Sequence, residues 1–384
     1  MERFYRSCFE TTSLKNYQNL MKIIDLYIIK KYLGTFGFML GLLTIIVLVI
    51  DVQAKAPRIE SNGFKVSDFL INFYPYWIVN MVITFMSILV FISVIFFTSR
   101  IANNTEIVAI ISSGTSFHRF ARPYLMTSGF IAVFALVLNH YVLPLANIKK
   151  NELEPYTYSA VNREEFTGNA EVSTQLSKTE YIFIKSYNKK EKRGSGLIYQ
   201  KFDKDRKLVH QINASEFYWE KTKNHFVLTN YLDKNILKDE TEKLANGNTM
   251  IKNFGHPPEE LFPDALLGQN KTTPELLQFI QREKDKGNAN LNNYLNELYQ
   301  RTSMPVSVVI LTILGLSLSS QKKRGGLGLN LALGIALAFV FVFSFEVLKV
   351  VSANKTLPPL LAMWLPNLIF GPIALYLYFQ RANQ

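Results

Sequence analysis

Cysteine and histidine are scarce in this chain. Cys8 is the only cysteine among 384 residues, so no disulfide can form within the chain and an ordinary apolar core must hold each domain. The five histidines are His118, His140, His210, His225 and His256, and no two have the H-x-x-x-H spacing of a helical metal site. The sequence therefore predicts neither a disulfide scaffold nor a metal site, and we expect no cofactor.

Nucleotide-binding and hydrolase motifs are absent as well. The sequence contains no G-x-x-x-x-G-K-[ST] loop, which excludes ATP binding by a P-loop, and no G-x-S-x-G nucleophile elbow. A basic domain is also missing. Residues 149–301 carry 24 Lys and Arg against 22 Asp and Glu, although the whole chain has a net charge of +12. These absences argue against an enzyme and against a nucleic-acid-binding protein.

Long uncharged stretches are what the chain does contain. Each is long enough to supply the roughly 20 apolar residues that a helix needs to cross a bilayer. The six stretches are Tyr32–Ile50, Phe69–Ser99, Pro123–Ile148, Thr302–Gln321, Gly325–Phe345 and Thr356–Gln380. We therefore predict an α-helical membrane protein with three transmembrane helices on each side of a large polar insert.

The distribution of basic residues predicts the orientation in the membrane. If the N-terminus is inside, the cytoplasmic segments hold 13 Lys and Arg, whereas the two short outer loops, 51–68 and 346–355, hold five. Short cytoplasmic loops are enriched in Lys and Arg. We expect both termini in the cytoplasm and the insert outside, although the basic residues of loop 51–68 weaken the contrast.

The insert alternates polar and apolar residues, as strands with one buried face do. The predicted strands are Tyr181–Ser186, Gly196–Phe202, Lys207–Trp219, His225–Tyr231 and Met250–Phe254, with turns that include Asn246–Asn248. Several short antiparallel strands are typical of a jelly roll or a sandwich. The predicted organisation is a leader at 1–20, a short interfacial helix and helices one to three at 21–148, an all-β jelly-roll-like domain at 149–262, a helical connector at 263–301 and helices four to six at 302–384.

A short amphipathic segment lies in the second cytoplasmic loop. In Asn103–Gly114, Asn103 and Glu106 have the spacing of a capping box, and Gly114 suits the position after a helix. We predict a helix here that rests on the membrane or on a partner. By itself Glu106 could be only a capping or solvated carboxylate, but such a helix suits the docking of a separate motor.

Several residues together make this chain similar to a known family. Ile24–Ile28 precedes the first span, Asn104–Gly114 has the pattern of a coupling segment that ends in glycine, and Leu357–Pro359 with Met363–Asn367 leads into the last span. With the arrangement of three spans, a β domain and three more spans, these segments resemble the LptF/LptG permeases of the lipopolysaccharide exporter. The resemblance covers the chain after Met21 and favours LptG slightly over LptF.

The resemblance implies one permease subunit of an ABC-type exporter in the inner membrane of a Gram-negative bacterium. It implies an LptB-like cytoplasmic ATPase, a paralogous permease, and an LptC-like periplasmic protein that receives lipopolysaccharide from the β domain. The ATPase contact falls on Glu106, Ile107, Ile110 and Gly114.

The resemblance implies that the lipid phosphates bind near Lys55. Ala54 replaces one of the family's two adjacent lysines here, and Arg58 and Lys65 complete a cationic rim. Lys55 and the nearby Asp51 could instead simply be solvated. The candidate acyl-chain contacts are Tyr181, Phe183, Phe202, Phe217 and Trp219, unless these aromatic residues form a closed core.

Two other functions fit the same pattern. One is a permease of another ABC-type exporter, for a different lipid or for a lipoprotein. The other is a non-transporting scaffold whose β domain binds an envelope protein, but a scaffold has no reason to present Asn103–Gly114 to a motor.

Overall fold

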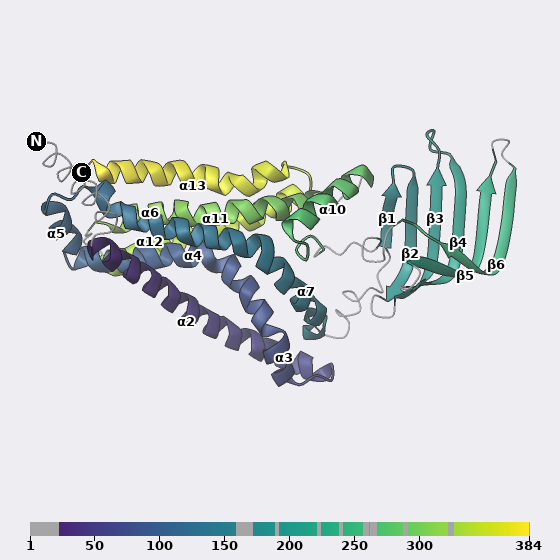
Figure 1. Cartoon of the computed structure of the whole chain (residues 1–384), viewed down its shortest axis with the longest axis horizontal. Coiled ribbons are helices and arrows are strands. Elements are labelled where there is room, and N and C mark those ends of the chain that lie inside the picture. The colour runs from purple at the N-terminus through teal and green to yellow at the C-terminus, as the bar shows by residue number, and fades with distance from the viewer. Residues whose placement is uncertain are drawn as a thin grey trace, which may run out of the picture. The chain divides into compact units, whose positions relative to one another are not determined.

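A computed structural model describes residues 23–158, 172–188, 192–220, 224–237, 241–255, 261, 267–286, 291–321 and 326–383. The predicted leader, 1–20, lies outside these residues. Among the described residues, six helices are long and apolar enough to cross a membrane. Three precede the sheet in the chain and three follow it (Figure 1). The prediction of a membrane protein with three helices on each side of an insert is confirmed.

The helices before the sheet include the first three spans. They are α2 (Ile23–Ser61), α3 (Val66–Asn72), α4 (Tyr74–Asn103), α5 (Glu106–Ser112), α6 (Phe117–Val137) and α7 (Leu143–Leu153). A π-helical turn at Leu138–Val142 joins α6 to α7, and a 3-10 turn at Glu154–Thr157 follows α7. After the sheet come α10 (Thr273–Lys286), α11 (Leu291–Ser319), α12 (Gly326–Ala353) and α13 (Pro359–Ala382).

Two predicted short helices are continuous with spans. The short interfacial helix expected before the first span is the beginning of α2, and the last part of the helical connector expected at 263–301 is the beginning of α11. No glycine or proline stands between either short helix and its span, so the backbone ladder continues. Ile28 and Tyr32 also share one buried core, which holds both parts of α2 in the same helix.

The helical core is built mainly on α4. Its side chains pack with α2, α5, α6 and α11 on one side, and with α11, α12 and α13 on another. Glycines allow the close approaches. A Cβ on Gly315 of α11 would lie 3.1 Å from the Phe91 ring of α4, and a Cβ on Gly334 of α12 would overlap Ile95 of α4. Small residues at such contacts let membrane helices pack backbone to backbone.

The insert forms one six-stranded sheet in which neighbouring strands pair antiparallel in chain order. The strands are β1 (Val172–Ser177), β2 (Glu180–Asn188), β3 (Arg193–Phe202), β4 (Leu208–Glu220), β5 (His225–Ile236) and β6 (Glu242–Lys252), and Figure 1 shows them in this order. The inserted all-β domain is therefore confirmed, and its sheet is a meander in which every strand lies beside its neighbour in sequence.

Two details of the sheet differ from the prediction. Strand β1 was not predicted, because VSTQLS is largely polar and has little alternation. The turn expected at Asn246–Asn248 is wrong, because these residues lie inside β6, where Gly247 pairs with Tyr231. A Cβ on Gly247 would lie 3.0 Å from the Tyr231 ring, so this glycine makes room for an aromatic side chain and does not mark a turn.

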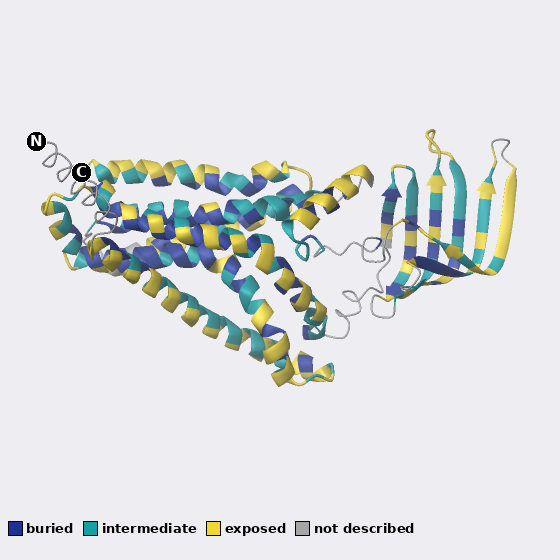
Figure 2. Cartoon of the chain, in the orientation of Figure 1, coloured by how far each residue is buried: buried dark blue, intermediate teal, exposed yellow. Residues whose placement is uncertain are grey.

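The core of the β domain covers one face of the sheet. Ile182, Ile184, Leu197 and Phe217 are among its buried residues, and Leu261 packs against the same face. Figure 2 shows the resulting alternation of buried and exposed residues along the strands. Burial raises the pKa of Tyr199 in this core to about 12, and the charge and hydrogen bond of Glu180 act in the same direction.

Candidate functional site

Two turns with left-handed backbone conformation separate helix α5 from α4 before it and from α6 after it. Thr105, the residue before it, has φ +63°, and Gly114 after it has φ +88°. Gly114 thus occupies the predicted position after the helix. The predicted capping box at Asn103 is wrong, because Asn103 is the last residue of α4. The Asn104 amide donates to Oε1 of Glu106 at 3.2 Å instead.

One face of α5 is buried and the other is exposed. Ile107 is 1% exposed and belongs to the helical core, and Ile110 packs against that core. Val108, by contrast, is 57% exposed, and its neighbour Ala109 is also exposed. Among the predicted contact residues, Glu106 is half-buried and Gly114 is exposed, while Ile107 points inward. The sequence analysis did not predict Val108 as a contact residue. The only indication in the sequence was an apolar residue at a position between those that face the core.

Glu106 is held by two neighbours. The Tyr27 hydroxyl of α2 donates to its Oε2 at 3.0 Å, and Asn104 occupies its Oε1. Two residues earlier in α2, Asp25 accepts two hydrogen bonds from the Arg119 guanidinium of α6, at 2.8 and 2.6 Å. The first turn of α2 is thus bonded to both α5 and α6.

Lys55 lies in a second polar cluster, toward the other end of α2. Its Nζ is 3.0 Å from Asp51 and lies over the rings of Phe73 and Trp77, 5.6 and 5.9 Å from their centres. The Tyr74 hydroxyl donates to the same Asp51 at 3.1 Å. The cation is therefore neither isolated nor simply solvated, since an anion and two aromatic faces stabilise it.

The other two predicted cations are more open. Arg58 near the end of α2 and Lys65 before α3 are both exposed, and within the described residues neither side chain has an ion-pair partner. These two residues are better placed than Lys55 to receive an external anionic group without breaking an existing contact.

The five predicted aromatic residues of the β domain occupy two faces of the sheet. Phe217 is 1% exposed in the core, and Trp219 packs against the same core. Phe183 is 39% exposed and pairs with Ile198, which is 37% exposed, on the opposite face. Tyr181 shares that second face, and its ring meets the Phe202 ring at 5.8 Å. A single groove cannot be lined by all five.

The core face remains open where β4, β5 and β6 meet. Trp219, Tyr231 and Met250 are only partly buried and pack against the core from this side. Tyr231 and Met250 were not among the predicted contacts. Tyr231 pairs with Gly247 and Leu228 with Met250, an odd spacing that would place them on opposite faces of a regular strand. Asn230, between them in β5, has φ +50°, and with this irregularity Tyr231 and Met250 pack against the same core.

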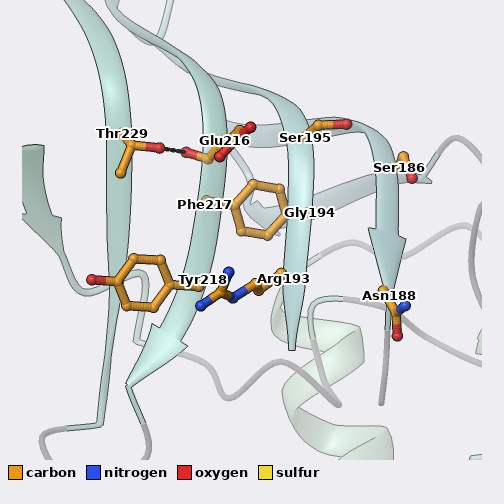
Figure 3. A pocket seen from close by; sticks show the side chains of 9 residues that line it. All are labelled: Ser186, Asn188, Arg193, Gly194, Ser195, Glu216, Phe217, Tyr218 and Thr229. Carbon is orange, nitrogen blue, oxygen red and sulfur yellow. Dashed lines mark hydrogen bonds between the residues drawn. The ribbon is translucent and has the colours of Figure 1, made fainter. Parts of the chain in front are cut away.

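A polar pocket of about 390 Å³ lies on β2 to β5. Figure 3 shows Arg193 beside Tyr218, with Phe217 next to Gly194, and the Arg193 guanidinium lies 5.7 Å from the centre of the Tyr218 ring. The Thr229 hydroxyl donates to the carbonyl of Glu216 at 3.1 Å. The described residues contain no group of three or more His, Cys, Asp or Glu that could hold a metal ion, in this pocket or elsewhere.

We expect Gly194→Ala to destabilise the β domain by roughly 2 kcal/mol, as overpacking of a core does. An added Cβ would overlap the Phe217 ring and would lie 2.6 Å from the carbonyl oxygen of Ser186. Thermal unfolding of the solubilised protein measures the effect. Gly129→Ala in α6 is the control, because its Cβ would meet nothing within 4 Å. Equal stability of the two variants would contradict the packing described.

Comparison with protein families identifies this architecture. Residues 26–380 match the family described as lipopolysaccharide export system permease LptF/LptG. The match begins within the first turn of α2 and ends within α13, so it includes α5, the Lys55 cluster and the sheet. A comparison with curated proteins finds no match. The chain belongs to the LptF/LptG family, and it is a multi-pass inner-membrane permease of lipopolysaccharide export rather than an enzyme.

Proposed function

We propose that this chain is one half of an ABC-type exporter that extracts lipopolysaccharide from the inner membrane and passes it through the β domain. The single observation that carries the proposal is the family match over residues 26–380 of a chain with six candidate spans and an inserted sheet. A paralogous permease, LptF- or LptG-like, supplies the other half. Of the two identities, we favour LptG for this chain.

A separate LptB-like ATPase supplies the energy in this proposal, because the sequence has no P-loop. It docks on α5, whose exposed surface combines an apolar patch at Val108 and Ala109 with the half-buried carboxylate of Glu106 and the exposed Gly114. Ile107 and Ile110 support this contact indirectly, because they anchor α5 to the helical core. This arrangement supports cytoplasmic termini, because the start of α2 is bonded to α5 and the end of α13 is bonded to the start of α6.

The lipid headgroup is recognised at the opposite end of α2. Arg58 and Lys65 offer exposed cations, and Lys55 adds a third cation that is already balanced by Asp51. A basic side chain near a membrane surface contributes about 1 kcal/mol toward an anionic headgroup. Lipid phosphates can therefore be bound by Arg58 and Lys65 first. Lys55 binds a phosphate when that phosphate replaces Asp51 as its anionic partner.

The acyl chains need an apolar path once they leave the bilayer, since each exposed methylene costs about 0.8 kcal/mol. The half-buried Trp219, Tyr231 and Met250 form an apolar rim beside the core of the sheet, with Phe217 beneath. The second face, with Tyr181, Phe183 and Phe202, is the alternative path. The exposed edge strand β6 suits an LptC-like periplasmic domain that continues the sheet.

Gentle solubilisation of the tagged protein, followed by identification of what copurifies, tests this function. We expect an ATPase and one related six-span permease. An ATPase with a lipid or lipoprotein cargo other than lipopolysaccharide would support an exporter of another substrate. Recovery of the chain alone, or with envelope proteins but without an ATPase, would contradict the half-transporter and leave the scaffold as the better explanation.

A further inference from the structure

The first turn of α2 is bonded on two sides. Asp25, which is 4% exposed, binds Arg119 of α6 through two hydrogen bonds, and Tyr27 binds Glu106 of α5 through one. Residues two positions apart in an α-helix point about 200° apart around its axis. Asp25 and Tyr27 therefore leave α2 in different directions, one toward α6 and the other toward α5.

The remainder of α2 is held less firmly by the chain itself. No residue of its most apolar 18-residue window is buried, whereas 56% of the corresponding window of α4 and 61% of that of α11 are buried. Figure 2 shows exposed and half-buried residues along most of α2. Near its start, Ile28 and Tyr32 are fully buried, and the Tyr32 hydroxyl is 2.8 Å from that of Thr312 in α11. α2 is thus held at its start, where it meets α5, α6 and α11, and again toward its end, where Ile59 is buried with Phe69 and Phe73, while the stretch between is exposed or half-buried.

The orientation of the Glu106 carboxylate is fixed by hydrogen bonds. Tyr27 bonds its Oε2 and Asn104 bonds its Oε1, so both carboxylate oxygens have donors from different segments. The donor from Asn104 lies in the turn before α5, two residues from Glu106. The donor from Tyr27 belongs to α2, so the Tyr27–Glu106 bond is a polar link from α5 to a membrane-spanning helix.

We propose that Tyr27 is a positioning residue for Glu106, and that the Tyr27–Glu106 hydrogen bond transmits movement of α5 to α2. The inference rests on the proposed function, because α5 moves in this scheme when the ATPase docked on it changes conformation. In this scheme Tyr27 acts through the Glu106 carboxylate, to which its hydroxyl is bonded. It orients the carboxylate and makes α2, the helix that also carries Lys55, follow α5.

The test is Tyr27→Phe in the purified complex with its ATPase and partner permease, reconstituted in proteoliposomes that contain lipopolysaccharide. Two rates are measured, ATP hydrolysis and release of lipopolysaccharide to a soluble acceptor, and their ratio is compared with that of the unmodified complex. We expect the ATPase to remain bound and lipid released per ATP to fall about tenfold, the effect of one hydrogen bond to an ionised group. A merely destabilised protein would lower both rates and leave their ratio unchanged.

Two further variants make the result decisive. Tyr376→Phe removes a hydroxyl from an exposed tyrosine of α13 and should leave the ratio unchanged. Glu106→Gln keeps an oxygen that accepts the hydrogen bond from Tyr27. The amount of lipid released per ATP should therefore fall less in Glu106→Gln than in Tyr27→Phe. An unchanged ratio in Tyr27→Phe would overturn the inference while the half-transporter stands. Failure of the unmodified chain to retain any ATPase would remove the proposed function and the inference with it.

Discussion

Reversing the charge at Glu106 is expected to abolish both ATPase association and lipopolysaccharide export. In Glu106→Arg, the Tyr27 hydroxyl loses its acceptor and the surface of α5 carries a cation where the proposed ATPase contact has a carboxylate. Folding should be little affected, because Glu106 is only half-buried and Ile107 continues to anchor α5. Copurification of the ATPase and complementation of export in cells that lack the native chain measure the two losses.

Glu152→Arg is the matched control. Its side chain is 66% exposed and forms only a 3.4 Å ion pair with Lys149 on the same helix. The same charge reversal at this position should leave ATPase association intact, since exposed ion pairs contribute little to stability. Normal copurification and normal export in Glu106→Arg would exclude α5 as the ATPase contact, provided that the variant unfolds at the same temperature as the unmodified protein.

The second large effect is expected from photo-crosslinking on the two faces of the sheet. A photoreactive residue at Trp219 should trap lipopolysaccharide in an ATP-dependent manner, because Trp219 lies on the open part of the core face beside Tyr231 and Met250. The same residue at Phe183 should trap little, since Phe183 lies on the opposite face with Ile198. Immunoblotting of crosslinked products with and without ATP measures both.

This comparison has three informative outcomes. ATP-dependent products at Trp219 alone assign the lipid path to the core face. Products at Phe183 alone assign it to the face that carries Tyr181 and Phe202. Products that are absent from both positions, or that form equally without ATP, contradict passage of the lipid through the β domain.

The membrane helices and the β insert were predictable because their signals are local. An uncharged stretch of about 20 residues favours a membrane-spanning helix wherever it occurs in the chain, and polar–apolar alternation favours a strand with one buried face. Gly114 was predictable for a similar reason, since the left-handed conformation after a helix favours glycine within that segment itself.

Predictions failed where a neighbour distant in sequence decided the structure. Asn246–Asn248 has the composition of a turn, but pairing with β5 places it inside β6, with Gly247 beneath the Tyr231 ring. The five aromatic residues predicted as acyl-chain contacts are divided between the two faces of the sheet, because a shift of one residue reverses the face of a strand. Composition alone could not show that Phe183 and Phe217 point to opposite sides.

The sequence by itself determined the class of protein: a membrane permease with three spans on each side of a β insert, no P-loop and a short helix suited to a partner. Only the tertiary structure decided which side chains of that helix are free and what holds Glu106. Tyr27 is 79 residues away from Glu106, and Asp25 is 94 residues from Arg119. No local propensity specifies such pairs, because they form only when packing of α2, α5 and α6 brings distant segments within hydrogen-bonding distance.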